Sequence, residues 1–251
     1  RLGNLITPRV AYSLRSLGTN QATVAATGDT VARADGKYVC QVRRDYDNAL
    51  KSFTATEITD GTLLSFVGTG GSNNGFVKTW YDQSTNGNLA VQSSAANQPK
   101  IVNAGALSTV GGLLFGFGGG PQKLQFTMFD SVDEVAIFSV VKFDDLEGTI
   151  IGSDGGDASF GTVDDQNYHF SNTATSEEGD LVTTLDTTNT FLMGMRFGQG
   201  ETGTEVISFV NGIIGENIST NDGNFEAMTI GDAGDFSALQ GTLKEVIIYD
   251  S

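Results

Sequence analysis

The side chains most able to do chemistry are few, because the chain has one cysteine, Cys40, and one histidine, His169. A hydrolytic triad needs a histidine beside a serine or cysteine nucleophile, and no Gly-x-Ser-x-Gly turn lies near His169. A single thiol forms neither an intrachain disulfide nor a zinc site of several thiolates. Cys40 stands in the apolar run 38–42 and His169 in a strand-like segment. We expect a buried structural thiol and a core or surface histidine.

Aromatic and polar side chains are concentrated where an apolar segment ends, at Trp80, Tyr81, Asp82 and Gln83. Trp80 is the only tryptophan and follows the apolar residues 76–77, so we expect it to be buried. Asp82 precedes the turn 84–88 and can accept hydrogen bonds from amides of that turn. An exposed aromatic side chain here that stacks on a sugar ring is the alternative interpretation.

Two adjacent arginines, Arg43 and Arg44, stand close in sequence to Asp45 and Asp47. Together with Asp82 they predict a partly buried ion-pair network that ties the N-terminal segment to the rest of the fold.

The charge is strongly acidic and unevenly distributed. The formal net charge is −16; residues 1–125 contribute +4 and residues 126–251 contribute −20. A negative field repels phosphate backbones, so we expect no nucleic-acid partner. The acidic half is explained by solubility, by a cation site, by docking on a basic neighbour or by head-to-tail contact between copies. No apolar stretch reaches membrane-spanning length, so we expect no membrane partner. Because the chain starts at Arg1, we expect a processed or excised piece.

The composition predicts many short strands joined by tight turns. Glycine is frequent (33 residues), proline is scarce (3) and only 18% of residues are charged. Short helices are expected at 11–17 and 56–67, the second with Asp60 as its cap and Gly68 at its end. Asn-Gly pairs at 86–87 and 211–212 predict hairpin turns. The expected strands are 37–43, 76–83, 89–92, 100–103, 112–117, 124–126, 133–143, 149–152, 168–170, 191–197, 205–210, 227–230 and 241–249.

This spacing predicts an all-β fold of two antiparallel sheets packed face to face. The apolar run 135–141 is compatible with either an interior strand or a buried helix. Its β-branched residues favour the strand. No linker divides the chain, so we expect one sandwich domain over residues 11–251 with an arm or linker over residues 1–10.

Several segments in this order resemble a known family. They are Ala-Tyr-Ser-Leu-Arg-Ser-Leu at 11–17, Val-Arg-Arg at 42–44 with Asp-Asn at 47–48, Thr-Trp-Tyr-Asp-Gln-Ser at 79–84 with Asn-Gly-Asn at 86–88, and Asn-Gln-Pro-Lys-Ile-Val at 97–102. They resemble the N-terminal part of the α-L-arabinofuranosidase B catalytic-domain family, in the version seen in structural proteins of tailed marine and cyanobacterial phages. The segment 240–249 resembles its last strand. The resemblance implies a concanavalin A-like jelly-roll sandwich with a small N-terminal elaboration and one short helix.

The family's catalytic groups do not carry over. Retaining glycosidases need two carboxylates about 5–5.5 Å apart. In the family the nucleophile is a glutamate near a cysteine pair, whereas the matching region 150–157 has neither residue type. The family's acid/base aspartate precedes the last strand, where Asp232 and Asp235 stand at a different spacing from Gln240. We expect no enzymatic activity and assign no catalytic residue.

The fold class suggests ligand sites in acidic loops, since concanavalin-like sandwiches bind glycans at their loop-bearing edges, sometimes through calcium. The candidate loops are 154–165 and 221–235, with Asp154, Asp157, Asp232 and Asp235 as ligand-binding candidates. Aspartates in glycine-rich turns often serve only the turn itself. We therefore expect no obligatory cofactor and leave calcium as a possibility.

The resemblance implies a non-enzymatic structural protein on the virion surface: a head decoration, a fibre or a tail-associated module. Its expected partners are other virion proteins and copies of itself, and residues 1–8, basic with three aliphatic side chains, are expected to lie across an acidic neighbouring copy. Two alternatives remain open: a carbohydrate-binding or host-adhesion module for a host-surface glycan, and a glycosidase for arabinose-containing polysaccharide.

Overall fold

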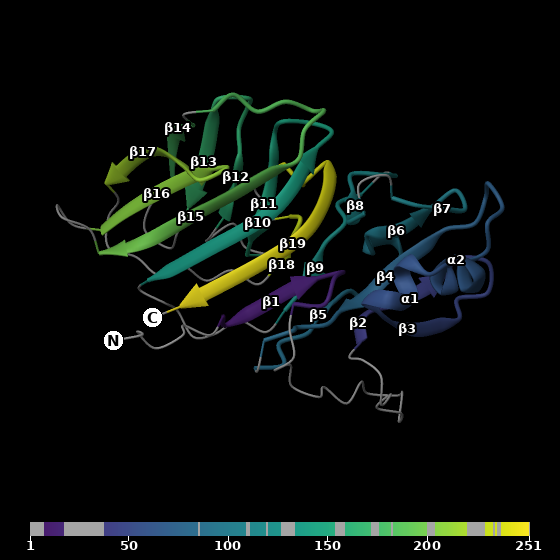
Figure 1. Ribbon diagram of the computed structural model, residues 1–251. Coiled ribbons are helices and arrows are strands. Elements are labelled where there is room, and N and C mark those ends of the chain that lie inside the picture. Colours follow the sequence, from purple (N-terminus) through teal and green to yellow (C-terminus); the bar gives the residue numbers. More distant parts are fainter. Residues whose placement is uncertain are drawn as a thin grey trace.

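The computed structural model confirms an almost entirely β fold (Figure 1). It describes residues 8–17, 38–84, 86–108, 111–118, 120–126, 134–153, 159–171, 176–181, 183–199, 204–219, 229–232, 234 and 237–250. Residues 1–7 of the expected arm therefore lie outside the described residues. In the described part of the chain, no helix has the length and apolarity needed to cross a membrane.

One antiparallel sheet, which we call sheet I, contains the longest strands. Among the described residues its order is β17–β16–β15–β10–β19–β1. Val10, in the first described strand, pairs with Ile248 in the last described strand, so segments from near the start and near the end of the sequence are adjacent in this sheet. The bounds are β1 Val10–Ser13, β10 Val135–Phe143, β15 Phe191–Gln199, β16 Thr204–Val210, β17 Ile213–Ser219 and β19 Gly241–Asp250.

The second sheet, sheet II, lies behind sheet I in Figure 1 and has the order β14–β13–β12–β11–β18–β9–β5. The rings of Phe170 and Phe197 stack between the two sheets with centroids 5.3 Å apart, so the apolar core lies between them. The bounds are β5 Ala90–Val91, β9 Leu124–Gln125, β11 Gly148–Gly152, β12 Ser159–Thr162, β13 Asn167–Ser171, β14 Ser176–Asp180 and β18 Thr229–Ile230.

The remaining elements form a lobe beside the sandwich, which we call the N-terminal lobe (Figure 1). Its strands pair in the order β3–β2–β4–β6–β8, with β7 on β6. Strand β8 pairs with β19 and β4 pairs with β5, so hydrogen bonds connect the lobe to both sheets. The bounds are β2 Tyr38–Arg44, β3 Leu50–Thr54, α1 Ala55–Thr59, α2 Thr62–Val67, β4 Gly75–Trp80, the 3-10 turn Ala95–Asn97, β6 Lys100–Asn103, β7 Ala106–Leu107 and β8 Leu113–Phe115.

The helix expectations needed three corrections. The helix expected over 11–17 is wrong, because residues 10–13 form β1 and all four are buried against β19 and the core. Pairing with a distant strand overrides local helix propensity there. The helix expected over 56–67 is divided at Asp60 and Gly61, where Gly61 adopts a left-handed φ of 92°. Asp60 is not the N-cap of either helix: Thr54 caps the first in a capping box and Gly61 holds the N-cap position of the second. Asp60 accepts the Thr62 amide at 2.8 Å from one residue earlier, and the second helix ends at Gly68 as predicted.

The two Asn-Gly pairs behave differently. Asn211 and Gly212 have φ values of 52° and 82° and join β16 to β17, which confirms that hairpin. The tight hairpin expected at Asn86–Gly87 is wrong, because the strand expected over 76–83 ends at Trp80 and the β4–β5 connection spans residues 81–89. The side chain of Asp82 organises this longer connection, as described below.

Candidate functional site

A bulge in β19 places two adjacent charged side chains on the outer face of sheet I. Opposite β10, Glu245 pairs with Val140 and Leu243 pairs with Val141, so Lys244 is an extra residue. A bulge breaks the strict alternation of side chains along a strand. Leu243 on one side of the bulge is fully buried in the core, whereas Lys244 is partly exposed and Glu245 reaches an arginine outside the core.

Arg15, just beyond the end of β1, forms a bidentate ion pair with the Glu245 carboxylate. Its Nε and Nη2 donate to the two carboxylate oxygens at 2.8 and 3.0 Å. The Glu245 side chain is only 10% exposed, whereas the Arg15 side chain is 73% exposed. The hydrogen bonds with Glu245 raise the pKa of Arg15 above its usual value. Because the guanidinium is so exposed, the pair contributes little to stability, and its effect is to fix the orientation of both groups.

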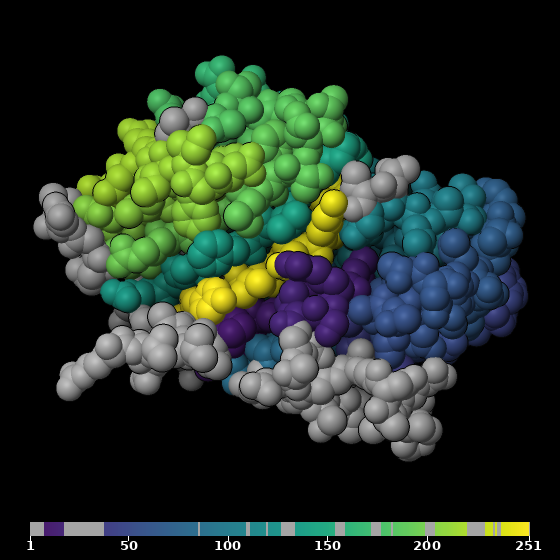
Figure 2. Space-filling model, viewed as in Figure 1, coloured from purple at the N-terminus to yellow at the C-terminus, as the bar shows by residue number. Residues whose placement is uncertain are grey.

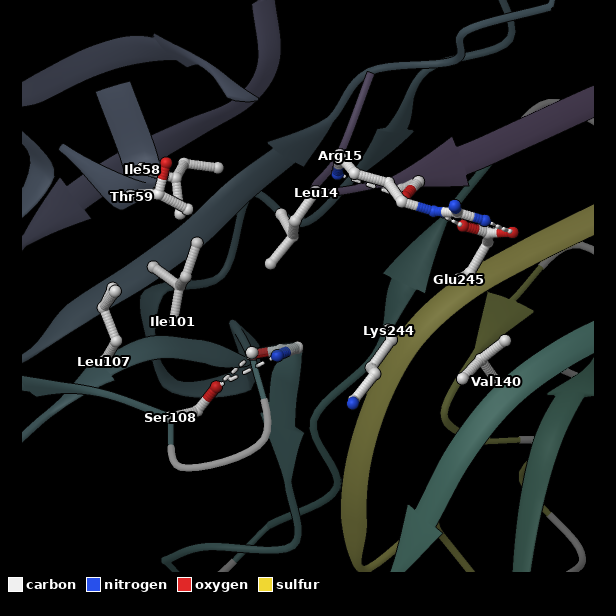
Figure 3. A pocket seen from close by; sticks show the side chains of 13 residues that line it. Leu14, Arg15, Ile58, Thr59, Ile101, Leu107, Ser108, Val140, Lys244 and Glu245 are labelled. Carbon is white, nitrogen blue, oxygen red and sulfur yellow. Dashed lines mark hydrogen bonds and ion pairs between the residues drawn. The ribbon is translucent and has the colours of Figure 1, made fainter. Parts of the chain in front are cut away.

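A cavity of about 290 Å³ opens beside this pair, between sheet I and the N-terminal lobe. We call it the cleft. Aliphatic side chains from four different elements form its wall, and Figure 3 shows Leu14, Ile58 and Ile101 pointing toward one another there. Leu107 and Val140 complete the apolar lining.

The lining of the cleft gives no sign of nucleophilic chemistry. The Ser13 hydroxyl accepts the Arg15 amide, and the Ser108 hydroxyl is hydrogen-bonded to the backbone of Gly112. Among the described residues no side chain or backbone group bonds the Lys244 ammonium at the rim. An aliphatic wall beside an ammonium and an oriented guanidinium suits a ligand with an apolar face and hydroxyl or anionic groups.

The acidic residues proposed for ligand binding do not line the cleft. Asp154, Asp157 and Asp235 lie outside the described residues. The Asp232 carboxylate is 3.4 Å from the Lys123 ammonium, accepts the Gly234 amide at 3.2 Å, and belongs to a residue only 5% exposed. Within the described ranges no three acidic, histidine or cysteine side chains are arranged to hold a metal ion. Calcium binding stays a prediction about the loops.

Asp82 is the centre of a hydrogen-bond network that anchors β1. Its Oδ1 accepts the amides of Ala11 and Ser84 at 2.9 and 2.8 Å, and its Oδ2 accepts the Asn88 amide and the Ser84 hydroxyl at 2.9 and 2.7 Å. Gln83 extends the anchor, because its side chain bonds Ser13 and two backbone groups beyond it. The expectation that Asp82 serves turn amides is confirmed.

The prediction that an ion-pair network of Arg43 and Arg44 ties the N-terminal segment to the rest of the fold is wrong. Arg44 pairs with Asp47 at 2.7 Å within the β2–β3 turn, where their hydrogen bond lowers the pKa of Asp47 to about 2. Arg43 instead donates to the side chains of Gln98 and Asn48. Both arginines sit on β2, and the network of Asp82 holds the N-terminal segment without them.

The aromatic residues of the same segment are internal, as the packing interpretation requires. Trp80 is fully buried, with its ring 5.6 Å from that of Tyr12, which confirms the expected burial. Tyr81 is 4% exposed and its hydroxyl shares a hydrogen bond of 3.0 Å with Ser52. Neither ring is available to stack on a sugar.

The single cysteine and the single histidine are both buried. Burial raises the pKa of the Cys40 thiol well above its usual value, so the thiol stays protonated and unreactive. His169, on β13, is 3% exposed, and burial lowers its pKa to about 4 despite opposing effects from the Thr162 backbone and Glu147. His169 is thus a core side chain, one of the two positions expected for it.

The depressed pKa of His169 predicts a pH dependence of stability. The folded protein keeps the ring neutral down to about pH 4, whereas the unfolded chain protonates it below its ordinary pKa of 6.5. The contribution of the neutral His169 ring to the free energy of unfolding is therefore complete above pH 6.5 and falls by about 3 kcal/mol as the pH drops to 4. The stability difference between wild type and His169→Gln should shrink by that amount between pH 7 and 4. The one histidine resonance in an NMR titration should have its midpoint near 4; a midpoint near 6.5 would contradict the burial.

Sequence inspection missed the three charged residues of the cleft, Arg15, Lys244 and Glu245. The only available signal was the adjacent charged pair at 244–245 inside an otherwise apolar last strand, because strict alternation would bury one of the two. Arg15 carries no such signal, since its partner lies 230 residues away.

The fold is shared with solved structures, while the sequence matches neither a protein-family profile nor a curated protein. A crystal structure of an arabinofuranosidase complexed with arabinofuranosyl-alpha-1,2-xylobiose superposes with a TM-score of 0.61 and 12% identity. The match covers 96% of this chain and 58% of that one, so the chain spans less than two thirds of the arabinofuranosidase. At this identity the likeness shows the fold alone, a concanavalin-like jelly-roll sandwich.

Two further matches are weaker. Domain 4 of AbnA, a GH43 extracellular arabinanase from Geobacillus stearothermophilus in complex with arabinotriose, gives a TM-score of 0.44 at 12% identity, over 69% of this chain and 75% of that one. The Ruminococcus gnavus IT-sialidase CBM40 bound to alpha2,3 sialyllactose gives 0.37 at 9%, over 47% and 76%. With TM-scores below 0.5, neither of these two likenesses says anything about the function of this chain.

Proposed function

We propose that this chain is a non-enzymatic structural protein on the surface of a tailed-phage particle. The observation that supports this proposal most is the structural role of the residues in the family-like segment. The segment that resembles both arabinofuranosidases and phage structural proteins provides Trp80, Tyr81, Asp82 and Gln83, and all four make internal contacts that anchor β1 or fill the core. A signature of this kind preserves a scaffold and does not require an activity.

The state of Asp232, one of the two candidate acids, supports a non-enzymatic role. A general acid must reach the leaving group of its substrate. Asp232 is nearly buried and its carboxylate is held by Lys123 and by the Gly234 amide. The region that matches the family's nucleophile, residues 150–157, contains no glutamate.

Purified particles of the source phage test the proposal. We expect mass spectrometry to find the chain among the virion proteins and labelled antibody to mark the particle surface in electron micrographs. The purified chain should not hydrolyse an aryl arabinofuranoside. Absence of the chain from the virion would refute the structural role. Turnover that is abolished by Asp157→Asn or Asp235→Asn would establish the glycosidase instead.

Glycan binding is the second candidate function, and the cleft favours it. The oriented Arg15–Glu245 pair and the Lys244 ammonium lie beside an aliphatic wall, which together match the hydroxyl groups and the C–H face of a saccharide. A glycan array with and without chelator is the corresponding measurement. Binding that is lost in Lys244→Ala would place the glycan in the cleft, and binding lost only with chelator would indicate the acidic loops.

A further inference from the structure

The outer face of sheet I is apolar where a solvent-facing sheet is normally polar. Along β10 the buried core residues alternate with partly exposed ones, and the latter include Phe138 and Val140. A strand with one wet face usually places polar residues there. Neighbouring strands continue the pattern. We call this surface the apolar face; its members are Phe138, Val140, Leu192, Ile207, Phe209, Ile214, Ile247 and Tyr249.

The apolar face has a row of aromatic rings at its centre. The rings of Phe138 and Phe209 lie 5.1 Å apart, and that of Tyr249 meets Phe138 edge-on at 6.0 Å. Gly194 stands between them on β15, and a Cβ there would overlap the Phe209 ring. The glycine therefore lets the Phe209 ring lie close to the backbone of β15.

No described helix or strand covers this face. Figure 2 shows β15, β10, β19 and β1 side by side on the surface turned toward the viewer. Leu192 on β15 is 41% exposed, and Ile214 on the edge strand β17 is 65% exposed. By contrast, all four residues of β12 in sheet II are buried. Contiguous exposed apolar surface of this kind marks an interaction site.

The charge distribution favours a second copy of the chain as the occupant. The C-terminal half has 23 acidic residues and only three basic ones, Lys142, Arg196 and Lys244, and these three stand on β10, β15 and β19 of sheet I. Lys142 is paired with Asp144, and Glu245 with Arg15. Most of the surface of this half would repel another copy. The strands of sheet I instead carry three basic residues against four acidic ones, Glu205, Glu216, Glu245 and Asp250.

The size of sheet I is sufficient for a stable contact between copies. Its six described strands, about 4.8 Å apart, span roughly 25–30 Å, and a nine-residue strand such as β10 is about 30 Å long. Because β1 has only four residues and carries no member of the apolar face, the remaining five strands present roughly 700 Å². This area is close to the contribution of one partner to a standard interface.

We propose that the apolar face is the contact between two copies of this chain, packed face to face about a two-fold axis. Such a contact is isologous, so each copy contributes the same aromatic row and the contact closes after two subunits. Burial of the aromatic row gives an attraction that salt does not screen. The inference deepens the proposed structural role, since it names a partner and a surface for it.

Sedimentation velocity on the whole chain, from about 1 to 100 μM, tests this contact. We expect a dimer whose dissociation constant rises at least tenfold in Leu192→Glu and in Ile214→Glu. Both side chains are exposed, so the monomer should fold unchanged. Phe138→Glu should abolish the dimer. Leu50→Glu is the matched control, because Leu50 on β3 is equally exposed (43%) but lies on the N-terminal lobe.

Two outcomes would overturn the inference. One is a wild-type chain that stays monomeric at 100 μM, and the other is a dimer that Leu192→Glu and Ile214→Glu leave unchanged. If the wild type is monomeric but Leu192→Glu prevents incorporation into particles, the face belongs to another particle protein. A dimer formed through this face by a chain absent from virions would refute the proposed function and leave the contact intact.

Discussion

Replacing Asp82 by alanine is expected to lower the free energy of unfolding by about 4 kcal/mol, since each buried donor left without an acceptor costs about 1–3 kcal/mol. The substitution removes the acceptor of three backbone amides, those of Ala11, Ser84 and Asn88, and of the Ser84 hydroxyl. Because Asp82 is 3% exposed, water does not readily replace the carboxylate. Equilibrium unfolding in urea measures the loss, which is a large part of the stability of an ordinary domain.

Asp82→Asn is the matched control for this prediction. The amide keeps one acceptor oxygen of the same shape and can still serve Ala11 and Ser84 through Oδ1. Its NH₂ group then faces the Asn88 amide, where two donors meet. We expect Asp82→Asn to lower the free energy of unfolding, but by less than Asp82→Ala does. If Asp82→Ala unfolds at the same urea concentration as wild type, β1 does not depend on this carboxylate.

Truncating Trp80 to alanine should cost about 3–5 kcal/mol, because a large cavity remains in a core that relaxes only in part. The indole has no exposed surface and packs against the Tyr12 ring of β1, while β4 pairs with both β2 and β5 around it. Thermal and urea unfolding measure the loss. The wild-type fluorescence maximum should be that of an indole shielded from water, and a maximum typical of exposed tryptophan would contradict the burial.

Trp80→Phe separates packing from hydrogen bonding. The indole N–H is buried and makes no hydrogen bond with any described group, so replacing it by phenylalanine removes a buried unsatisfied donor along with some volume. The two effects oppose one another. The loss of stability should therefore be much smaller than that of Trp80→Ala. Equal losses for the two variants would show that an aromatic ring at this position does not contribute to packing.

Much of the β architecture was determined by the sequence alone. The composition and turn residues predicted the all-β class, and strand β6 was predicted with the observed bounds, 100–103. The Asn211–Gly212 turn was predictable because a tight hairpin needs positive φ, which this pair adopts at little cost. Burial of Trp80 followed from its place at the end of an apolar strand. These features depend on interactions within a few residues, so a local pattern is enough to specify them.

The cleft and the apolar face were decided only by the tertiary structure. Residues 10–13 became β1 because the last strand pairs with them, and Arg15 meets Glu245 across 230 positions of the sequence. The bulge at Lys244 appears only in the register of β19 against β10. The apolar run 135–141 predicted a strand, but which of its faces is covered depends on what lies on either side of sheet I. Pairing register and layer order arise from contacts between distant segments, and no local pattern encodes them.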